Sequence, residues 1–175
     1  FLPNQFWQNK NHELVVQSLS ILKSSSLTDV QVVCTGNPLD HRQPDYFGKL
    51  MGMVSTHNLE ENFRVLGIVP LKHAQALMYH SLAVLNPSRF EGWSTSVEEA
   101  KTMDKTILLS SIPVHLEQDP PRGVFFDPDN ANQLAQIISS QYMHVTSCVE
   151  PKYRLESYED RLRVYGDSYI AILEK

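Results

Sequence analysis

The sequence predicts an α/β fold in which helices cover both faces of a parallel β-sheet. Short apolar segments typical of buried strands alternate with amphipathic segments of helical period from residue 3 to residue 140. Parallel strands need long crossover connections, and the intervening helical segments can provide them. With 175 residues, the chain is also long enough for one domain with one sizeable core. We therefore expect a Rossmann-like, doubly wound parallel sheet of about six strands.

The first half of the chain contains three successive strand and helix segments. The strand segments are rich in apolar and β-branched residues and end near glycine, proline or polar turn residues. Helices are expected where apolar residues recur at helical spacing. In chain order the segments are a strand at 2–7, a helix from Asn11, a strand at 29–35, a helix at 45–57, a strand at 63–66 and a helix from Pro70.

The second half continues the alternation and ends in a tail that is charged at first and amphipathic later. Its strands are expected at 82–85, 107–109 and 124–126, and its helices at 95–103 and 131–139. Residues 153–175 favour one or two further helices on the outside. These patterns divide the chain into a Rossmann-like domain at 1–145 and a helical tail at 146–175 packed on the same domain.

Composition and charge exclude several classes of function. The 15 basic and 20 acidic residues give a net charge of −5 without a basic stripe, so no nucleic acid partner is expected. No apolar run reaches the roughly 18 to 20 residues that span a bilayer, and no signal-peptide pattern follows Phe1. Cys34 and Cys148 form no CxxC pair, which favours reduced thiols in a cytoplasmic protein. The absence of an initial Met before an early strand predicts a domain excised from a longer protein.

Residues 87–100 join a buried strand to a helix at the sheet edge where doubly wound folds bind ligands. This segment contains two carboxylates, Glu91 in the loop and Glu99 about one turn into the helix. Ionised carboxylates accept paired hydrogen bonds, which suits them to the vicinal hydroxyls of ribose or a hexose. The amides of residues 94–97 begin the helix and offer an anion site for a diphosphate.

The same residues also fit a helix cap that needs no ligand. Thr95 with Glu98, and Ser96 with Glu99, both match the capping box, in which Ser or Thr is followed three residues later by Glu. Spacing alone gives the two interpretations equal weight. Glu98 is the better capping residue, which leaves Glu99 for a ligand.

The motif resembles the EX7E region of glycosyltransferase family 4. Glu91-Gly92-Trp93 is followed, at the family's interval, by Glu99-Ala100. The resemblance extends in order through residues 3–140. It includes segments similar to the family's first strand and phosphate-reaching Lys (5–12), its base-binding turn (65–70), the stretch after the EX7E region (107–117) and the closing strand and helix (126–135).

This resemblance implies the C-terminal, donor-binding half of a retaining glycosyltransferase of the GT-B fold. Lys10 would contact the donor diphosphate and Glu91 the hydroxyls of the transferred sugar, as the catalytic residues. The backbone at Val69 would contact the base, and Glu99 the ribose. The whole implied donor-binding set is Gln5, Lys10, Val69, Glu91, Gly92, Trp93, Ser94, Thr95 and Glu99.

The resemblance also implies a reaction and its partners. A nucleoside-diphosphate sugar would be the donor in glycan biosynthesis, a hydroxyl group would accept the sugar, and no metal or other cofactor would be needed. The acceptor would bind a missing N-terminal domain, so this chain alone would bind donor without transferring sugar. In the full-length, cytoplasmic enzyme, any peripheral membrane contact would come through that missing domain.

Two departures from the family pattern keep a second function open. Gln5 stands where many relatives have Arg, and Ser94 where a glycine often follows the aromatic residue. Both changes favour a non-catalytic, nucleotide-binding regulatory or scaffold domain, whereas the matching Lys and Glu residues favour the enzyme. A flavodoxin-like receiver would need an acidic cluster after the first strand, which Asn4 and Gln5 do not provide.

Histidines, tryptophans and the segment after residue 110 provide further candidates. The seven histidines are scattered, so surface or capping roles are expected rather than a metal site. Trp7 and Trp93 suit stacking on a sugar or base, although burial is the more common state of such side chains. His115 and Glu117 follow a strand at the ligand edge and are candidates for lining the cleft.

Overall fold

The computed structural model describes residues 1–147, in which five short strands form two parallel sheets. β1 (Val32–Cys34) pairs with β2 (Phe63–Val65). The second sheet has the order β3 (Val84–Asn86), β4 (Ile107–Ser110) and β5 (Gly123–Phe126). Because every pairing is parallel and helices connect the strands, the predicted α/β, Rossmann-like fold is confirmed.

Phe1 and Leu2 lie between the two sheets and join them. The Leu2 amide donates to the Val33 carbonyl over 2.9 Å, and Leu2 forms an isolated parallel bridge with β1. On the other side, the Phe1 amino group donates to the Ala83 carbonyl over 2.9 Å, and the Leu85 amide donates to the Phe1 carbonyl over 2.8 Å. The order across the molecule is therefore β2, β1, residues 1–2, β3, β4 and β5. Its direction reverses at the N-terminal segment, which is where sheets of this kind bind ligands.

The expected strand at 2–7 is wrong beyond Leu2. Pro3 has no amide hydrogen for a strand ladder, and the chain turns away after it. The Phe6 amide donates to the Asn37 carbonyl over 3.0 Å, and the 3-10 helix η1 (Gln8–Lys10) follows directly. This turn brings residues 4–10 to the end of the sheet where β3 finishes.

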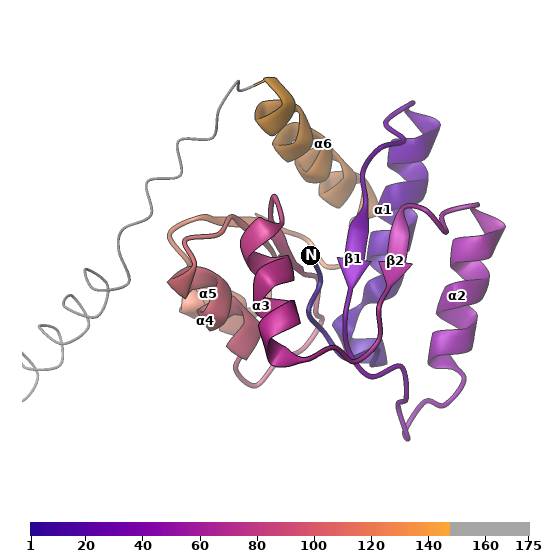
Figure 1. The fold of residues 1–175 in the computed structure, drawn as a ribbon, viewed down its shortest axis with the longest axis horizontal. Coiled ribbons are helices and arrows are strands. Elements are labelled where there is room, and N and C mark those ends of the chain that lie inside the picture. The colour runs from indigo at the N-terminus through magenta and orange to yellow at the C-terminus, as the bar shows by residue number, and fades with distance from the viewer. Residues whose placement is uncertain (148–175) are drawn as a thin grey trace, which may run out of the picture.

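Helices cover both faces of the sheets (Figure 1). On one face lie α1 (His12–Ser24), α2 (Tyr46–Thr56) and α6 (Ala131–Ser147). On the opposite face lie α3 (Leu71–His80) and α4 (Thr95–Thr102). Two layers of helices therefore enclose the two parallel sheets and the segment that joins them.

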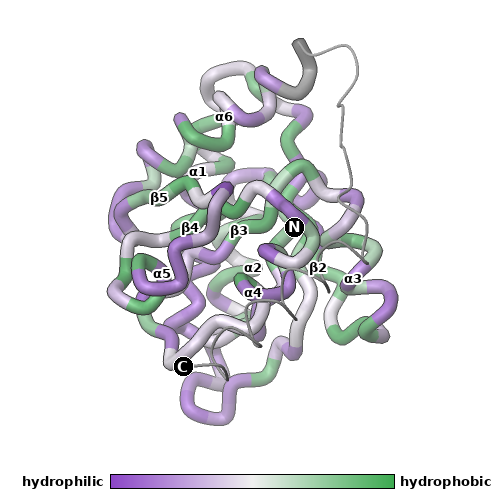
Figure 2. The backbone as a smooth tube through the Cα atoms, turned by 90° about the vertical axis from the view of Figure 1, so that its left-hand side faces the viewer, coloured by the Kyte–Doolittle hydropathy of each residue, from purple (hydrophilic) through white to green (hydrophobic). Residues whose placement is uncertain are grey.

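Two clusters of buried side chains hold these layers together. The larger packs α1, α2 and α6 against strand residues that include Leu85 and Leu108, and the smaller packs α3 and α4 against Phe1 and Ile107. Successive residues of a strand point to opposite faces, so β3 and β4 need apolar residues at consecutive positions. Figure 2 shows hydrophobic residues where helices meet strands and hydrophilic ones at the outer turns.

Two helices differ from the sequence prediction. α5 (Pro113–Gln118) was not expected, although Pro113 suits its first position, where the missing amide hydrogen has no partner to lose. α6 runs to Ser147 instead of ending at 139, so the first two residues of the predicted tail continue it. The rest of that tail, with Cys148, lies outside the described residues. Among residues 1–147, no helix is long and apolar enough to span a bilayer.

Candidate functional site

A buried polar network forms where β3 ends. The Asn86 side chain donates to Ser94 Oγ over 2.7 Å, and its Oδ1 accepts hydrogen bonds from Asn4 Nδ2 over 3.1 Å and from Ser88 Oγ over 2.8 Å. Asn86 and Ser88 are fully buried. Because buried polar groups are costly unless they are paired, this network fixes the loop after β3 against the turn after Leu2.

The same loop is also tied to η1 and the start of α1. Asn11 Nδ2 donates to the Pro87 carbonyl over 3.1 Å, and the Arg89 amide donates to the Asn9 carbonyl over 2.8 Å. Asn11 has a left-handed backbone with φ of 57°, a conformation that Asn tolerates better than most residues. These contacts set Lys10, at the end of η1, directly opposite Glu91.

Lys10 and Glu91 form a close and largely buried ion pair. Lys10 Nζ donates to both carboxylate oxygens of Glu91, over 2.6 and 2.8 Å, and Ser88 Oγ donates to Glu91 Oε1 over 2.7 Å. The two side chains are only 13% and 9% exposed. The site thus holds one positive and one negative group side by side, each with access to a small cavity.

This cavity has a volume of about 190 Å³ and lies at the carboxyl ends of the central strands. Its lining is mostly polar and comes from two segments far apart in the chain. The lining residues are Pro3, Asn4, Gln5, Trp7, Lys10, Glu91, Trp93, Ser94, Thr95 and Ser96.

Gly36 allows the first of these segments to take its path. Its φ is +142°, and a Cβ at this position would lie 2.4 Å from the Asn4 carbonyl oxygen and 2.9 Å from the Gln5 Cα. Only a glycine leaves room for the turn to pass this closely. The segment that follows β1 therefore packs closely against the turn at 4–5.

Six of the nine predicted donor-site residues line this cavity, and three do not. Gln5, Lys10, Glu91, Trp93, Ser94 and Thr95 come together there. Gly92 is exposed beside it, Glu99 is exposed on α4, and Val69 lines a second, larger cavity. Sequence reasoning missed the network of Asn86 and Ser88, for which the only signal was a polar residue ending an apolar strand.

Gln5 and the two tryptophans have specific surroundings. Gln5 Oε1 accepts a hydrogen bond from the Asn37 amide over 2.6 Å, so this side chain braces the neighbouring loop. The Arg42 guanidinium lies over the Trp7 ring, 5.1 Å from its centre. Trp7 is 36% exposed and Trp93 52%, so the expectation that burial is their more common state is wrong here. Both rings can therefore reach a ligand.

The first turn of α4 opens onto the cavity without a side-chain cap. Ser94 is the N-cap residue and makes no capping hydrogen bond, so neither predicted capping box forms. Glu98 instead accepts a hydrogen bond from Gln118 Nε2 over 2.8 Å and pairs with Lys101 over 3.2 Å. The Val97 and Glu98 amides donate to the Ser94 carbonyl, over 3.2 and 3.3 Å. The Thr95 and Ser96 amides come before the first bond of the helix, which leaves them available to an anion.

Two histidines are buried near the site, contrary to the expected surface or capping roles. His12 stacks on Phe6 with ring centres 4.5 Å apart, and burial, more than the nearby Lys10 charge, lowers its pKa to about 3. His115 Nδ1 lies 2.9 Å from the Ser110 carbonyl oxygen, and burial lowers the pKa of His115. Neither His115 nor the exposed Glu117 lines the small cavity. Within residues 1–147, no three His, Cys, Asp or Glu residues gather as a metal site.

Comparison with solved structures shows the same fold in several glycosyltransferases. A glycosyltransferase from Rickettsia africae is 20% identical with a TM-score of 0.71, and the match covers 82% of this chain and 37% of that one. Anabaena HepE, solved with UDP-glucose, is 19% identical with a TM-score of 0.72, over 83% and 40% of the two chains. The C-terminal domain of LpcC from Francisella tularensis is 17% identical with a TM-score of 0.69, over 83% and 74%.

The matched region is only part of each of these proteins. The chain spans 37 to 40% of the length of the first two of these proteins but 74% of the isolated C-terminal domain. No curated protein sequence matches the chain significantly. The sequence profile described as "Glycosyl transferases group 1" matches residues 2–142, nearly all of the described structure. The chain therefore belongs to the group 1 glycosyl transferases.

Proposed function

We propose that this chain is the donor-binding half of a retaining GT-B glycosyltransferase, which transfers a sugar from a nucleoside-diphosphate sugar to a hydroxyl acceptor. The observation that carries the proposal is the Lys10–Glu91 pair, set in a polar cavity beside the uncapped first turn of α4. Anabaena HepE, which shares the fold, was solved with UDP and with UDP-glucose. That likeness supports a nucleotide sugar as the donor.

The diphosphate would bind one residue of the ion pair, and the transferred sugar would bind the other. Lys10 would turn from Glu91 to the diphosphate, where the first amides of α4 add further hydrogen bonds. Glu91 would then accept hydrogen bonds from hydroxyls of the transferred sugar. Ser88 would keep Glu91 in place during this exchange, because its hydroxyl already donates to the carboxylate.

The base and ribose would lie beyond the small cavity. A volume of about 190 Å³ suits the sugar and diphosphate better than a whole nucleotide sugar. The exposed carboxylate of Glu99 forms no ion pair with another of residues 1–147 and would accept hydrogen bonds from the ribose diol. The backbone around Val69 would contact the base.

Catalysis in this half would be electrostatic. Lys10 and the α4 amides would stabilise the negative charge that develops on the departing diphosphate, so no metal cofactor is proposed. Gln5 adds no charge, and its side-chain carbonyl oxygen accepts a hydrogen bond from the Asn37 amide. Lys10 is therefore the cation that residues 4–10 supply. A second, N-terminal domain would bind the acceptor and close the cleft, and any membrane contact of this cytoplasmic enzyme would come through it.

A non-catalytic nucleotide-binding domain is the second candidate. Two observations favour it: Gln5 braces a loop, and Ser94, which replaces the family's glycine, is buried in the polar network. Both candidates bind a nucleotide. They differ in whether the full-length protein transfers sugar.

The proposal is tested by binding of nucleoside diphosphates to the wild-type chain and to Lys10→Gln. A hydrogen bond to a charged group contributes about 1.5 to 3 kcal/mol, so the Kd of the preferred diphosphate should rise about 10- to 100-fold. Lys49→Gln, at an exposed position on α2, is the matched control and should leave the Kd unchanged. Calorimetry with UDP, GDP and ADP measures this and also selects the base.

The proposal is contradicted if none of the three diphosphates binds the wild-type chain. It is also contradicted if Lys10→Gln binds the preferred diphosphate with the same Kd as the wild type. Sugar transfer by the full-length protein then separates the two candidates. The enzyme is expected to lose transfer in Lys10→Gln, whereas the non-catalytic domain shows none in either form.

A further inference from the structure

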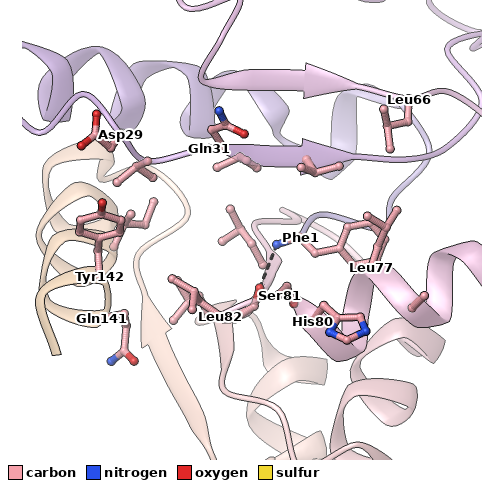
Figure 3. Close-up of a pocket in the computed structure, with 18 of the residues that line it drawn as sticks. Phe1, Asp29, Gln31, Leu66, Leu77, His80, Ser81, Leu82, Gln141 and Tyr142 are labelled. Carbon is pink, nitrogen blue, oxygen red and sulfur yellow. Dashed lines mark hydrogen bonds between the residues drawn. The ribbon is translucent and has the colours of Figure 1, made fainter. Parts of the chain in front are cut away.

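The small cavity has little net charge of its own for a diphosphate, which is negative on both phosphates. Among the described residues that line it, only Lys10 and Glu91 are charged, and they neutralise each other. The larger cavity between β1 and β3 (Figure 3) offers no alternative place, because nearly all of its surface is apolar and no Lys or Arg lines it. A second cation for the diphosphate is therefore to be sought at the edge of the small cavity.

Arg42 places a positive charge at this edge. Its guanidinium lies over the ring of Trp7, 5.1 Å from the ring centre, and Trp7 lines the small cavity. Arg42 belongs to the segment between β1 and α2, which Figure 1 shows at the carboxyl end of β1. The face of an aromatic ring attracts a guanidinium group, so Trp7 holds this charge beside the candidate site.

Asp40 binds one edge of the guanidinium and leaves the other edge free. Arg42 Nε donates to Asp40 Oδ1 over 3.1 Å, and Arg42 Nη2 lies 3.5 Å from Asp40 Oδ2. The Asp40 side chain is only 4% exposed, whereas that of Arg42 is 67% exposed. Arg42 Nη1 has no hydrogen-bond partner among residues 1–147. The guanidinium is therefore oriented in advance, with donors on its free edge that suit an oxyanion.

Gln5 anchors the loop that carries Arg42. The Gln5 Oε1 atom accepts a hydrogen bond from the Asn37 amide over 2.6 Å, and the Asn37 carbonyl accepts one from the Phe6 amide over 3.0 Å. Within the loop, the Leu39 amide donates to Asn37 Oδ1 over 3.0 Å. Gln5 supplies no charge itself, but these contacts hold the loop with the charged Arg42 beside the small cavity.

We propose that Arg42 is the second cation of the donor site and binds the diphosphate together with Lys10. This inference rests on the proposed function and adds to it a residue from the loop after β1. Lys10 would approach the phosphates from η1, and Arg42 from the opposite side of Trp7, with a planar fork that suits phosphate oxygens. Arg42 would keep its contacts with Trp7 and Asp40, because only its free edge binds the ligand.

Arg42→Gln tests the proposal by calorimetry with the preferred nucleoside diphosphate and its sugar conjugate. The Kd of both ligands should rise about 10- to 100-fold, because both contain the diphosphate. Arg122→Gln is the matched control, since Arg122 also pairs with an aspartate, Asp104, but precedes β5 at the opposite edge of the sheet. This control should leave both Kd values unchanged.

Asp40→Asn separates a direct contact with the ligand from mere support of the loop. This change keeps the size of the side chain and leaves Arg42 in place, so the Kd of the diphosphate should change by less than about 3-fold. Added salt provides a second measurement. It should weaken diphosphate binding more in the wild type than in Arg42→Gln, because the variant has lost one contact between opposite charges.

Unchanged Kd values in Arg42→Gln would overturn the proposal. Lys10→Gln, measured in parallel, keeps the two proposals apart: if it alone weakens binding, the donor site stands and only Arg42 is removed from it. Equal losses in Asp40→Asn and Arg42→Gln would assign the effect to the fold of the loop and overturn the proposal as well. A loss of affinity for the sugar conjugate alone would place Arg42 against the sugar instead of the diphosphate, which also contradicts it.

Discussion

Lys10 and Glu91 form the ion pair at the centre of the candidate site. Each neutralises the other in a largely buried place, and Ser88 supplies the additional hydrogen bond. In the proposed function, a nucleotide sugar would replace both partners of the pair, with an anion for Lys10 and hydroxyls for Glu91. The ion pair therefore keeps both side chains oriented while limiting the cost of their burial.

At this scale the sequence predicts which side chains line the small cavity better than it predicts how they are held. The spacing of Glu91 and Glu99 and the position of Lys10 are visible in the chain itself. The network through Asn86 is not, because an Asn after an apolar run is equally typical of a turn. The same applies to Gln5, whose partner, the Asn37 amide, comes from a loop 32 positions away.

Glu99→Gln should weaken nucleoside diphosphate and sugar nucleotide alike, by about 10- to 100-fold, if Glu99 holds the ribose common to both. Glu99 is exposed, so its substitution should leave the Tm unchanged. Calorimetry with both ligands measures the effect, and the exposed Glu60→Gln is the control. Unchanged affinity for both ligands would remove Glu99 from the site.

His12→Phe should reduce the loss of stability in acid. The pKa of His12 is about 3 in the folded chain against 6.5 for a free ring, so only the unfolded form gains a proton as the pH falls below 6.5. Stability is thus highest above pH 6.5 and is lost toward pH 3, with a slope that approaches about 1.4 kcal/mol per pH unit. Phe keeps the stacking on Phe6 and removes this slope.

Urea unfolding at several pH values from neutral down to mildly acidic measures the change. Burial also lowers the pKa of His115, so both proteins should still lose part of their stability in acid. The exposed His41→Gln variant should follow the wild type. Identical pH profiles for His12→Phe and wild type would show that His12 is not kept neutral by the fold.

Among the elements, the strands and helices whose apolar residues recur with a clear periodicity are predicted well, and the N-terminal segment is not. β4 and α2 differ from their expected bounds by one residue or less at each end, because apolar runs and helical spacing define them. The strand expected at 2–7 fails because Pro3 and the contact with Asn37 turn the chain, and a single sequence does not show that long-range contact. This difference affects the candidate site, since the turn carries Lys10 to Glu91.

Gly36→Ala should destabilise the chain by about 2 kcal/mol or more and weaken ligand binding with it. The new Cβ would overlap the Asn4 carbonyl, and the positive φ of Gly36 is unfavourable for Ala. Gly52→Ala is the matched control, because Gly52 lies within α2 with open space around it. That change should stabilise the chain by about 0.5 to 1 kcal/mol. Denaturant unfolding compares the two, and a neutral Gly36→Ala would mean that the turn does not need this close contact.

For the whole molecule, residues 1–147 form one Rossmann-like unit with its small polar cavity beside the N-terminal turn. The doubly wound order reverses at Phe1 and Leu2, and the cavity opens next to that reversal. The chain spans 37 to 40% of two structurally similar glycosyltransferases. We expect this chain alone to bind donor, and transfer to require the acceptor domain of the full-length enzyme.

The most direct test of this account is calorimetric titration of wild type and Glu91→Gln with the preferred nucleoside diphosphate and its sugar conjugate. Removing the Glu91 charge releases Lys10 to the diphosphate, so the affinity for nucleoside diphosphate should stay the same or increase. The sugar conjugate should lose its contact with Glu91 and bind about 10- to 100-fold more weakly relative to the diphosphate than in wild type. If Glu91→Gln weakened both ligands equally, the division of the site between Lys10 and Glu91 would be contradicted.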